Sequence, residues 1–180
     1  MRRRDEVDFT EFATAAVRRL RRTAYLMCGD WHRAEDAAQD ALVRVYKAWH
    51  RLDHRAGLNT YAHKAVVSVV LDQAKRPWRR EHVVGRPVDQ PADQALADPA
   101  GTIDDRLLVI QALAELPPRQ RACVVLRYYA DLSLEETASV LGIGVGAVKS
   151  QSSRGLATLR EVLDRPELEE PVDDREEVLS

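Results

Sequence analysis

Apolar side chains recur every three or four residues between Asp8 and Lys75, and no stretch alternates apolar and polar residues as a strand does. The recurrence is interrupted at Gly29 and again across residues 51–59, so the pattern predicts three helices in the first part of the chain. Asp8 is placed to cap the first helix and Thr60 the third, because both side chains can accept a hydrogen bond from the free N–H groups of a first helical turn.

The second predicted helix, which ends near His50, has two well-separated faces. By helical spacing, its buried positions are Ala38, Ala41, Leu42, Val45, Tyr46 and Trp49. Its outward positions are Asp36, Gln39, Asp40, Arg44 and Lys47. Such a polar face is typical either of a docking surface or of an ordinary solvated helix.

The composition changes between Arg76 and Thr102, where four prolines are interspersed with Asp, Gln and Ala. This stretch cannot assemble an apolar face, and we expect residues 81–104 to form a flexible linker. Helical periodicity resumes at Ile103, stops at the proline pair that begins at Pro117, and restarts at Ala122, which predicts one helix on each side of the prolines.

Residues Ser133–Glu136 form a capping box, which marks the start of a helix. That helix ends at Gly142, and another runs from about Gly146 to Leu163. Two helices joined by a short glycine-containing turn predict a helix-turn-helix, whose second helix enters the DNA major groove. A plain helical hairpin or a protein-binding domain would give the same pattern.

The second helix of this motif also has two predicted faces. The inward positions are Val148, Ser152, Gly155, Leu156 and Leu159. The outward positions are Gly146, Lys149, Ser150, Ser153 and Arg154. Lys and Arg side chains can meet phosphates or guanine edges, and Ser can contact either, so the outward set forms a candidate DNA-reading surface.

These elements predict an all-α chain with two small domains. We expect an N-terminal helical bundle over residues 1–80 and a C-terminal four-helix helix-turn-helix domain over residues 105–165, joined by the linker. Residues 166–180 are acidic, contain two prolines, and are expected to be a disordered tail.

The net charge of −2 conceals a division along the chain. Residues 1–80 carry 17 basic and 10 acidic side chains, a balance of +7, whereas residues 164–180 carry 2 basic and 8 acidic ones, a balance of −6. The basic part suggests a polyanionic partner, although a solvated surface would have the same composition. The acidic tail is either solvated or a mimic of DNA that restrains the last domain.

Neither the cysteines nor the histidines predict a special site. Cys28 and Cys123 are too few for a disulfide framework, which fits a reducing cytoplasm, and no apolar run is long enough to cross a bilayer. Cys28 with His32, and His50 with His54, have the i, i+4 spacing of metal ligands, but each pair crosses a predicted helix boundary and lacks further ligands. We therefore expect no metal, no cofactor and no catalytic site, and a protein that is not an enzyme.

Two runs of residues, one in each predicted domain, together resemble a known family. The first includes Gly29-Asp30, Ala34–Asp40 and Val45–Trp49. The second includes Leu116–Arg121, Val125–Tyr129, Asp131–Ser133, Thr137-Ala138, Leu141-Gly142, Gly146 and Val148–Ser150. In this order, across about Phe9 to Leu163, they are similar to the −10-reading and −35-reading domains of extracytoplasmic-function (group 4) RNA polymerase sigma factors of the sigma-70 family.

The resemblance implies an alternative sigma factor that binds core RNA polymerase and directs transcription from specific promoters. It implies polymerase binding by the outward residues Asp36, Gln39, Asp40 and Arg44. It implies recognition of the −35 element by Gly146, Lys149, Ser150, Ser153 and Arg154. It implies contacts with the −10 element by Asp53, His54, Arg55, Asn59, Tyr61, His63, Lys64 and Ser68.

Within the −10 set, Tyr61 is either an aromatic that stacks on a flipped base or a core residue, and His63 and Lys64 are placed as phosphate contacts. The family also implies an anti-sigma factor, with the protein a monomer when free or in a 1:1 complex with that inhibitor. The chain departs from the family at Ser68, Gly144 and Gln151, and Gly144 leaves the recognition helix without a side-chain cap.

Two other functions stay open at this point. An autonomous, dimeric helix-turn-helix regulator would need a dimerisation face, and no further apolar face is visible in the sequence. A sigma-like protein-interaction module without DNA binding is the second alternative, and Gly144, Gln151 and the acidic tail are compatible with it.

Overall fold

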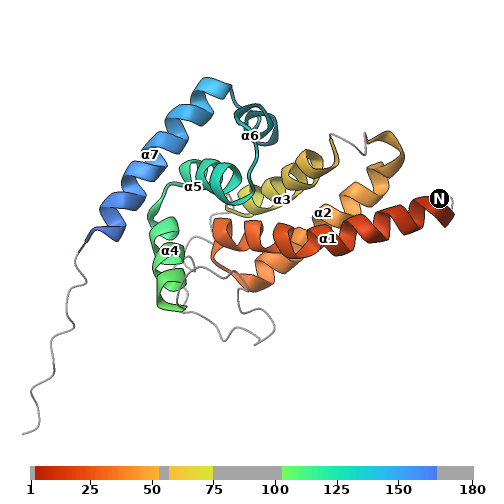
Figure 1. The fold of residues 1–180 in the computed structure, drawn as a ribbon, viewed down its shortest axis with the longest axis horizontal. Helices are drawn as coiled ribbons and strands as arrows, with labels where there is room; N and C mark the ends of the chain where they lie inside the picture. Colours follow the sequence, from red (N-terminus) through yellow and green to blue (C-terminus); the bar gives the residue numbers. More distant parts are fainter. Residues whose placement is uncertain (1–2, 53–56, 75–102, 166–180) are drawn as a thin grey trace, which may run out of the picture.

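The computed structural model describes residues 3–52, 57–74 and 103–165, and in these ranges every regular element is helical (Figure 1). The elements are α1 (Arg3–Cys28), α2 (Trp31–Ala48), the 3-10 turn η1 (Trp49–Arg51), α3 (Leu58–Ala74), α4 (Ile103–Glu115), α5 (Pro118–Val124), the π-helical turn η4 (Val125–Tyr129), α6 (Leu134–Leu141) and α7 (Val145–Leu163). The all-α fold class is thereby confirmed. The predicted linker lies outside the described residues except for 103–104, which begin α4, and the tail 166–180 lies outside them entirely.

Two expected caps are wrong. The first helix begins at Arg3, so Asp8 lies inside α1, where Asp5 and Glu6 provide the acidic first turn that favours the helix dipole. The third helix begins at Leu58, and Thr60 is already within it. In both cases the helix begins before the residue that the local pattern selected, by five residues for Asp8 and by two for Thr60.

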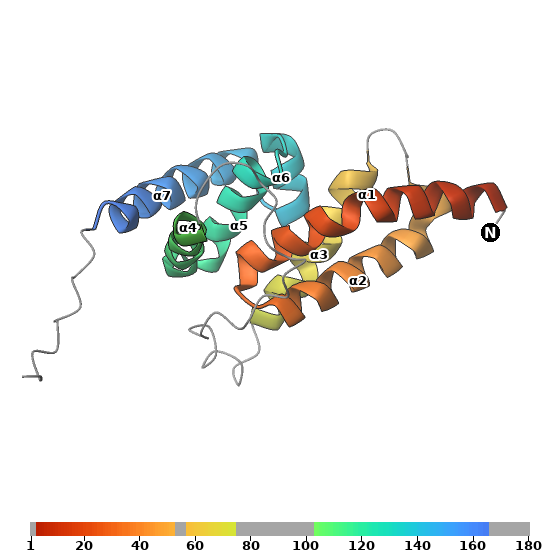
Figure 2. The same cartoon turned by 60° about the horizontal axis from the view of Figure 1, so that its bottom comes forward.

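Helices α1 and α2 form an antiparallel pair, and α3 packs across them (Figure 2). The turn between α1 and α2 depends on Gly29, whose φ is +70°, and on Asp30, whose carboxylate accepts a hydrogen bond from Arg33 N at 3.0 Å. The core contains many alanines, which let the helix backbones approach closely. Fully buried members are Leu20, Ala24, Ala34, Ala37, Ala41, Val45, Ala62 and Val66.

Trp49 is 2% exposed and packs in this core, as its spacing predicted. Its ring meets Phe9 edge-on at a centroid distance of 5.3 Å and Phe12 at 5.9 Å. Tyr46 was also predicted to be buried, but it is 44% exposed. Its ring contacts Phe9 at 5.0 Å at the edge of the cluster, because Trp49 already fills the interior.

The C-terminal half is held together by close contact between α5 and α7. Gly155 on α7 lies against α5, and a Cβ there would stand 2.7 Å from Val124 Cγ2 and 3.2 Å from Leu116 Cδ2. A residue without a side chain is therefore required for this helix crossing. Leu116, Leu126 and Val148 are fully buried around it.

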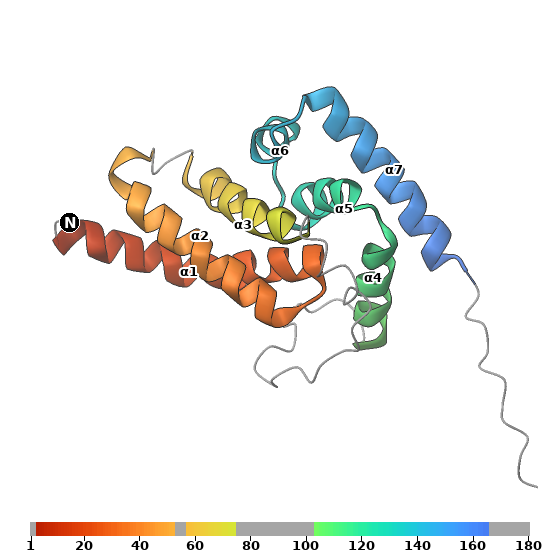
Figure 3. The same cartoon turned by 180° about the vertical axis from the view of Figure 1, so that it is seen from behind.

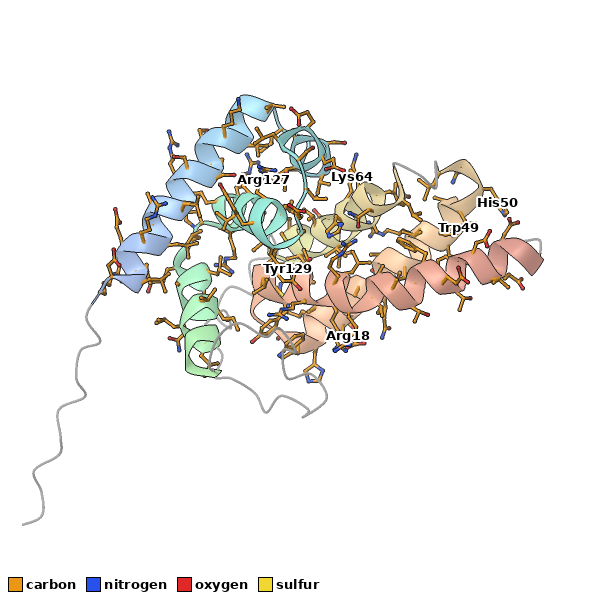
Figure 4. All side chains as sticks on the ribbon, viewed as in Figure 1. Arg18, Trp49, His50, Lys64, Arg127 and Tyr129 are labelled. Carbon is orange, nitrogen blue, oxygen red and sulfur yellow. The ribbon has the colours of Figure 1, made fainter. Side chains whose placement is uncertain are left out.

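The segment after α5 does not continue as an ordinary α-helix. It passes through the π-helical turn η4, in which Ala130 N donates to Val125 O at 3.0 Å. Asp131 follows with a φ of 55°. This geometry turns Tyr129 toward α1, where the Arg22 guanidinium lies 5.3 Å from its ring centroid (Figure 4).

The two halves of the chain pack against each other. Helix α3 contacts α6, and α1 contacts α4, α5 and η4; Figures 1 and 3 show α6 beside α3 from opposite sides. Buried apolar residues of both halves form one contiguous cluster, from Leu20 and Val66 in the first to Leu116 and Leu132 in the second. The sequence left the relative placement of the halves open, and the structure brings them together.

Candidate nucleic-acid interface

Helix α7 presents a polar face of the kind that can read DNA. Its inward positions Val148, Ser152 and Gly155 are buried, as their spacing predicted. The outward positions are all exposed, namely Gly146, Lys149, Ser150, Ser153 and Arg154. Lys149 and Arg154 therefore stand on one accessible face with hydroxyl groups between them.

The preceding helix and turn fix the direction of α7. The predicted capping box is confirmed: Glu136 N donates to Ser133 Oγ at 3.0 Å, and Ser133 N donates to Glu136 Oε2 at 2.8 Å. Gly142 ends α6 with a φ of 64°, and α7 then begins after Gly144, which makes no side-chain cap bond. As the sequence predicted, no side chain caps the free N–H groups in the first turn of α7.

Residues at the start of α3 form a second polar region, next to the segment 53–56. Asn59 Oδ1 accepts a hydrogen bond from Arg19 Nη2 of α1 at 2.5 Å, and Lys64 is exposed on the same helix (Figure 4). Tyr61 is half-buried and packs against the core. Ser68, also half-buried, donates to Asp72 Oδ2 at 3.5 Å. Asp53, His54 and Arg55 lie outside the described residues.

His63 does not reach the surface in this arrangement, unlike the exposed phosphate contact that the sequence suggested. It is 0% exposed, and its Nδ1 lies 2.9 Å from the carbonyl oxygen of Asn59. Burial lowers the pKa of its imidazole, and the nearby Arg19 guanidinium lowers it further, against opposing effects of the Asn59 carbonyl and Glu136. A neutral, buried imidazole cannot act as a phosphate contact until its surroundings open.

The outward face of α2 is accessible as predicted. Asp36, Gln39, Asp40 and Arg44 are all exposed. Carboxylate, amide and guanidinium groups on one rigid helix can set the register of a partner protein.

Two comparisons with protein families match both halves of the chain. The family described as Sigma-70 region 2 matches residues 12–80, and the family described as Sigma-70, region 4 matches residues 106–159. The chain belongs to the sigma-70 family.

Individual relatives agree with this assignment. This sigma factor is 33% identical over 171 residues to the RNA polymerase sigma-E factor of Streptomyces avermitilis, a match that covers 95% of this chain and 93% of the relative. It is 30% identical over 159 residues to the ECF RNA polymerase sigma factor SigM of Mycobacterium tuberculosis, covering 88% of this chain and 79% of that one.

A solved structure supports the fold. The sigma factor RpoE, crystallised in complex with the anti-sigma factor NepR from Bartonella quintana, matches with a TM-score of 0.70. The match covers 88% of this chain and 99% of that chain at 24% sequence identity.

The sequence of this sigma factor did not reveal two neighbours of the candidate surfaces. Val43, 50% exposed, lies on the outward face of α2 beside Gln39 and Asp40. Its spacing of three and four residues from them was the available signal. Arg19 reaches Asn59 across 40 residues of sequence, and no local pattern could have paired them.

Within the described ranges, no group of three or more His, Cys, Asp or Glu residues is placed to hold a metal ion. Cys28 and Cys123 are both buried free thiols. None of the helices in the described part of the sigma factor is long and apolar enough to cross a membrane.

Proposed function

We propose that this alternative sigma factor docks on core RNA polymerase through the outward face of α2 and reads a promoter through two separate DNA surfaces. The observation that carries the proposal is the occurrence of both sigma-70 regions in order on one chain, with an exposed basic face on the second helix of its helix-turn-helix. Polymerase docking is assigned to Asp36, Gln39, Asp40 and Arg44. Their exposure and mixed charge support a contact that selects orientation.

The −35 element is assigned to α7. Lys149 and Arg154 would neutralise phosphates or donate to guanine, while Ser150 and Ser153 would bond to either phosphates or base edges. Gly146 has no side chain, so the DNA could approach the backbone of the first helical turn. Two DNA-binding modules on one polymerase gain affinity from each other through their effective concentration.

The −10 element is assigned to the start of α3 and the segment before it. The proposed −10 contacts are Asn59, Tyr61, Lys64 and Ser68, together with Asp53, His54 and Arg55. His63 becomes a further contact once it is uncovered. Removing a base from the stack costs a few kcal/mol, which a pocket and a stacking aromatic such as Tyr61 can offset.

The proposal also includes where the protein acts and which partner inhibits it. A sigma factor works where core polymerase and DNA are, which places this chain in the cytoplasm, and it contributes binding rather than catalysis to initiation. Because the similar RpoE was crystallised with an anti-sigma factor, we also propose an inhibitor that holds this protein in a 1:1 complex, with the free protein a monomer.

Run-off transcription with purified core polymerase on fragmented genomic DNA tests this function. We expect discrete transcripts that core polymerase alone does not produce. The double variant Lys149→Ala, Arg154→Ala should reduce them at least tenfold, since each lost DNA contact costs about 1–3 kcal/mol. Arg160→Ala is the matched control, because Arg160 is exposed on the same helix but lies six residues beyond Arg154, C-terminal to the proposed DNA contacts.

Two results would contradict the proposal. Transcripts that persist at full level in the double variant would remove α7 from promoter recognition. A folded protein that binds core polymerase but yields no transcript would favour a protein-interaction module.

A further inference from the structure

Asn59, one of the residues proposed above to contact the −10 element, is held by an arginine of another helix. Arg19 Nη2 on α1 donates a hydrogen bond to Asn59 Oδ1 at the start of α3, over 2.5 Å and across 40 residues of sequence. A bond from a charged donor is shorter and stronger than one between neutral groups. Arg19 is exposed and Asn59 is half-buried, so the pair lies at the surface of the protein.

The chemistry of the two groups decides how the Asn59 amide is oriented. A guanidinium carries five N–H donors and no acceptor, so only the oxygen of the amide can face it. The amide nitrogen, Nδ2, lies on the other side of this planar group. Asn59 therefore directs its acceptor toward Arg19 and its two N–H donors away from it.

The backbone of Asn59 is fixed by a second, separate contact. His63 Nδ1 lies 2.9 Å from the Asn59 carbonyl oxygen, and His63 is 0% exposed. Because a carbonyl oxygen can only accept, the imidazole donates through Nδ1 in this contact. Backbone and side chain of Asn59 are thus both held before any ligand arrives, and such preorganisation favours a selective contact.

The orientation of the amide matters because the bases of DNA differ in the groups that they present. An asparagine that is free to turn can match adenine with two bonds, accepting from the N6 amino group while it donates to N7. An asparagine that offers only N–H donors loses the first of these bonds. It can still donate to O4 of thymine or to O6 of guanine.

We propose that Arg19 is a positioning residue for promoter recognition: by holding Asn59 Oδ1 it makes Asn59 a hydrogen-bond donor only, so the −10 base beside Asn59 is selected for a carbonyl acceptor, as in thymine or guanine, and against adenine. This inference rests on the function proposed above, which assigns the −10 element to the start of α3. Arg19 acts through Asn59 and does not contact the base itself.

Arg19→Met is the decisive variant, because methionine keeps an unbranched side chain but cannot donate to Asn59 Oδ1. Arg19 is exposed, so the fold should tolerate the change. Arg19→Lys retains a head group that only donates, and should preserve the orientation of the amide. Arg18→Met is the matched control, since Arg18 is the preceding residue of α1, is exposed, and loses the same charge (Figure 4).

The measurement is run-off transcription with core polymerase and the full-length protein. The templates are a pool that carries one promoter identified by the genomic run-off assay, with its −10 element randomised. Sequencing the transcripts gives, at each position, the output with adenine relative to the output with the preferred base. We expect one position at which the parent prefers thymine or guanine over adenine and at which Asn59→Ala loses that preference.

At that position, Arg19→Met should raise the relative output with adenine at least about threefold, which is less than the discrimination that one good base contact provides. Arg19→Lys and Arg18→Met should keep the base preference of the parent. In the Asn59→Ala background, Arg19→Met should cause no further change of the preference, because the two residues act in series.

The base preference separates this role of Arg19 from the alternatives. If Arg19→Met lowered the output of all templates equally, Arg19 would be a phosphate contact and the proposal would be overturned. If it still changed the preference in the Asn59→Ala background, Arg19 would read a base directly, which would overturn the proposal as well. A failure of the proposed function gives a different result, because the parent would then yield no transcript from any template, and both proposals would be wrong.

Discussion

Arg121 Nη1 donates a hydrogen bond to the carbonyl oxygen of Met27 at 3.0 Å, across 94 residues of sequence. The Nη2 atom of the same guanidinium donates to Ala114 O at 2.6 Å and to Leu116 O at 3.1 Å. Arg121 is 7% exposed. One buried side chain therefore donates hydrogen bonds to carbonyl groups at the end of α4 and links them to the end of α1.

Replacing Arg121 with methionine should lower the free energy of unfolding by about 2–4 kcal/mol. The variant keeps much of the apolar stem but leaves buried carbonyl oxygens without donors, each at a cost of about 1–3 kcal/mol. Urea unfolding followed by circular dichroism measures the change. Arg119→Met on the exposed side of α5 should change the value by less than about 0.5 kcal/mol. Similar values for both variants would contradict the role of the buried bonds.

Gly155→Ala should destabilise the C-terminal half by about 1–3 kcal/mol, because the new methyl group would meet Val124 Cγ2 at 2.7 Å in a packed core. Gly146→Ala on the same helix meets nothing within 4 Å and should stabilise the protein by up to about 1 kcal/mol, through helix propensity. Thermal unfolding compares the two. If Gly155→Ala left the stability of the protein unchanged or increased it, α5 and α7 would be able to move apart without a loss of stability.

The free energy of unfolding should depend on pH in part through the protonation of His63. Burial lowers the pKa of His63 in the folded state below its ordinary value of 6.5. The unfolded chain therefore binds a proton more readily, so this group's contribution is complete above pH 6.5 and is lost as the pH falls toward and through the folded pKa. The slope is at most about 1.36 kcal/mol per pH unit for one group.

Urea unfolding at several pH values tests this effect, with His63→Gln expected to flatten the profile just below pH 6.5. His32→Gln is the control, since His32 is exposed. The contribution of Glu136 appears in a separate window: its folded pKa is lowered from 4.5, so its stabilisation is present above that pH and lost below it. If the free energy of unfolding of His63→Gln fell as steeply with decreasing pH as that of the parent, the pH dependence could not be assigned to His63.

Features that depend on neighbouring residues were predictable from the sequence. The Ser133 capping box and the inward positions Val148 and Ser152 follow from the spacing of a few residues, and the structure confirms them. Asp8 failed as a cap because several residues near a helix start can serve, and the local pattern does not choose among them.

Contacts between distant segments were not predictable in the same way. Arg19 with Asn59, Thr60 with Glu136, and Arg121 with Met27 join residues separated by 40 or more positions. An arginine in the run Leu116–Arg121 looks like any other charged helix residue until the packing of the two halves is known. The π-helical turn η4 was missed because its apolar spacing also fits an α-helix.

The aromatic cluster around Trp49 also determines what intrinsic fluorescence can detect. Trp31, stacked on Tyr25 at 3.9 Å, and Trp49 both belong to the N-terminal half, and the sequence has no tryptophan after Trp78. Tryptophan emission therefore monitors the first half, while the far-ultraviolet circular dichroism signal averages over helices of both halves. Coincident unfolding curves from the two signals would mean that the halves melt as one cooperative unit, and separated curves would resolve the order in which they come apart.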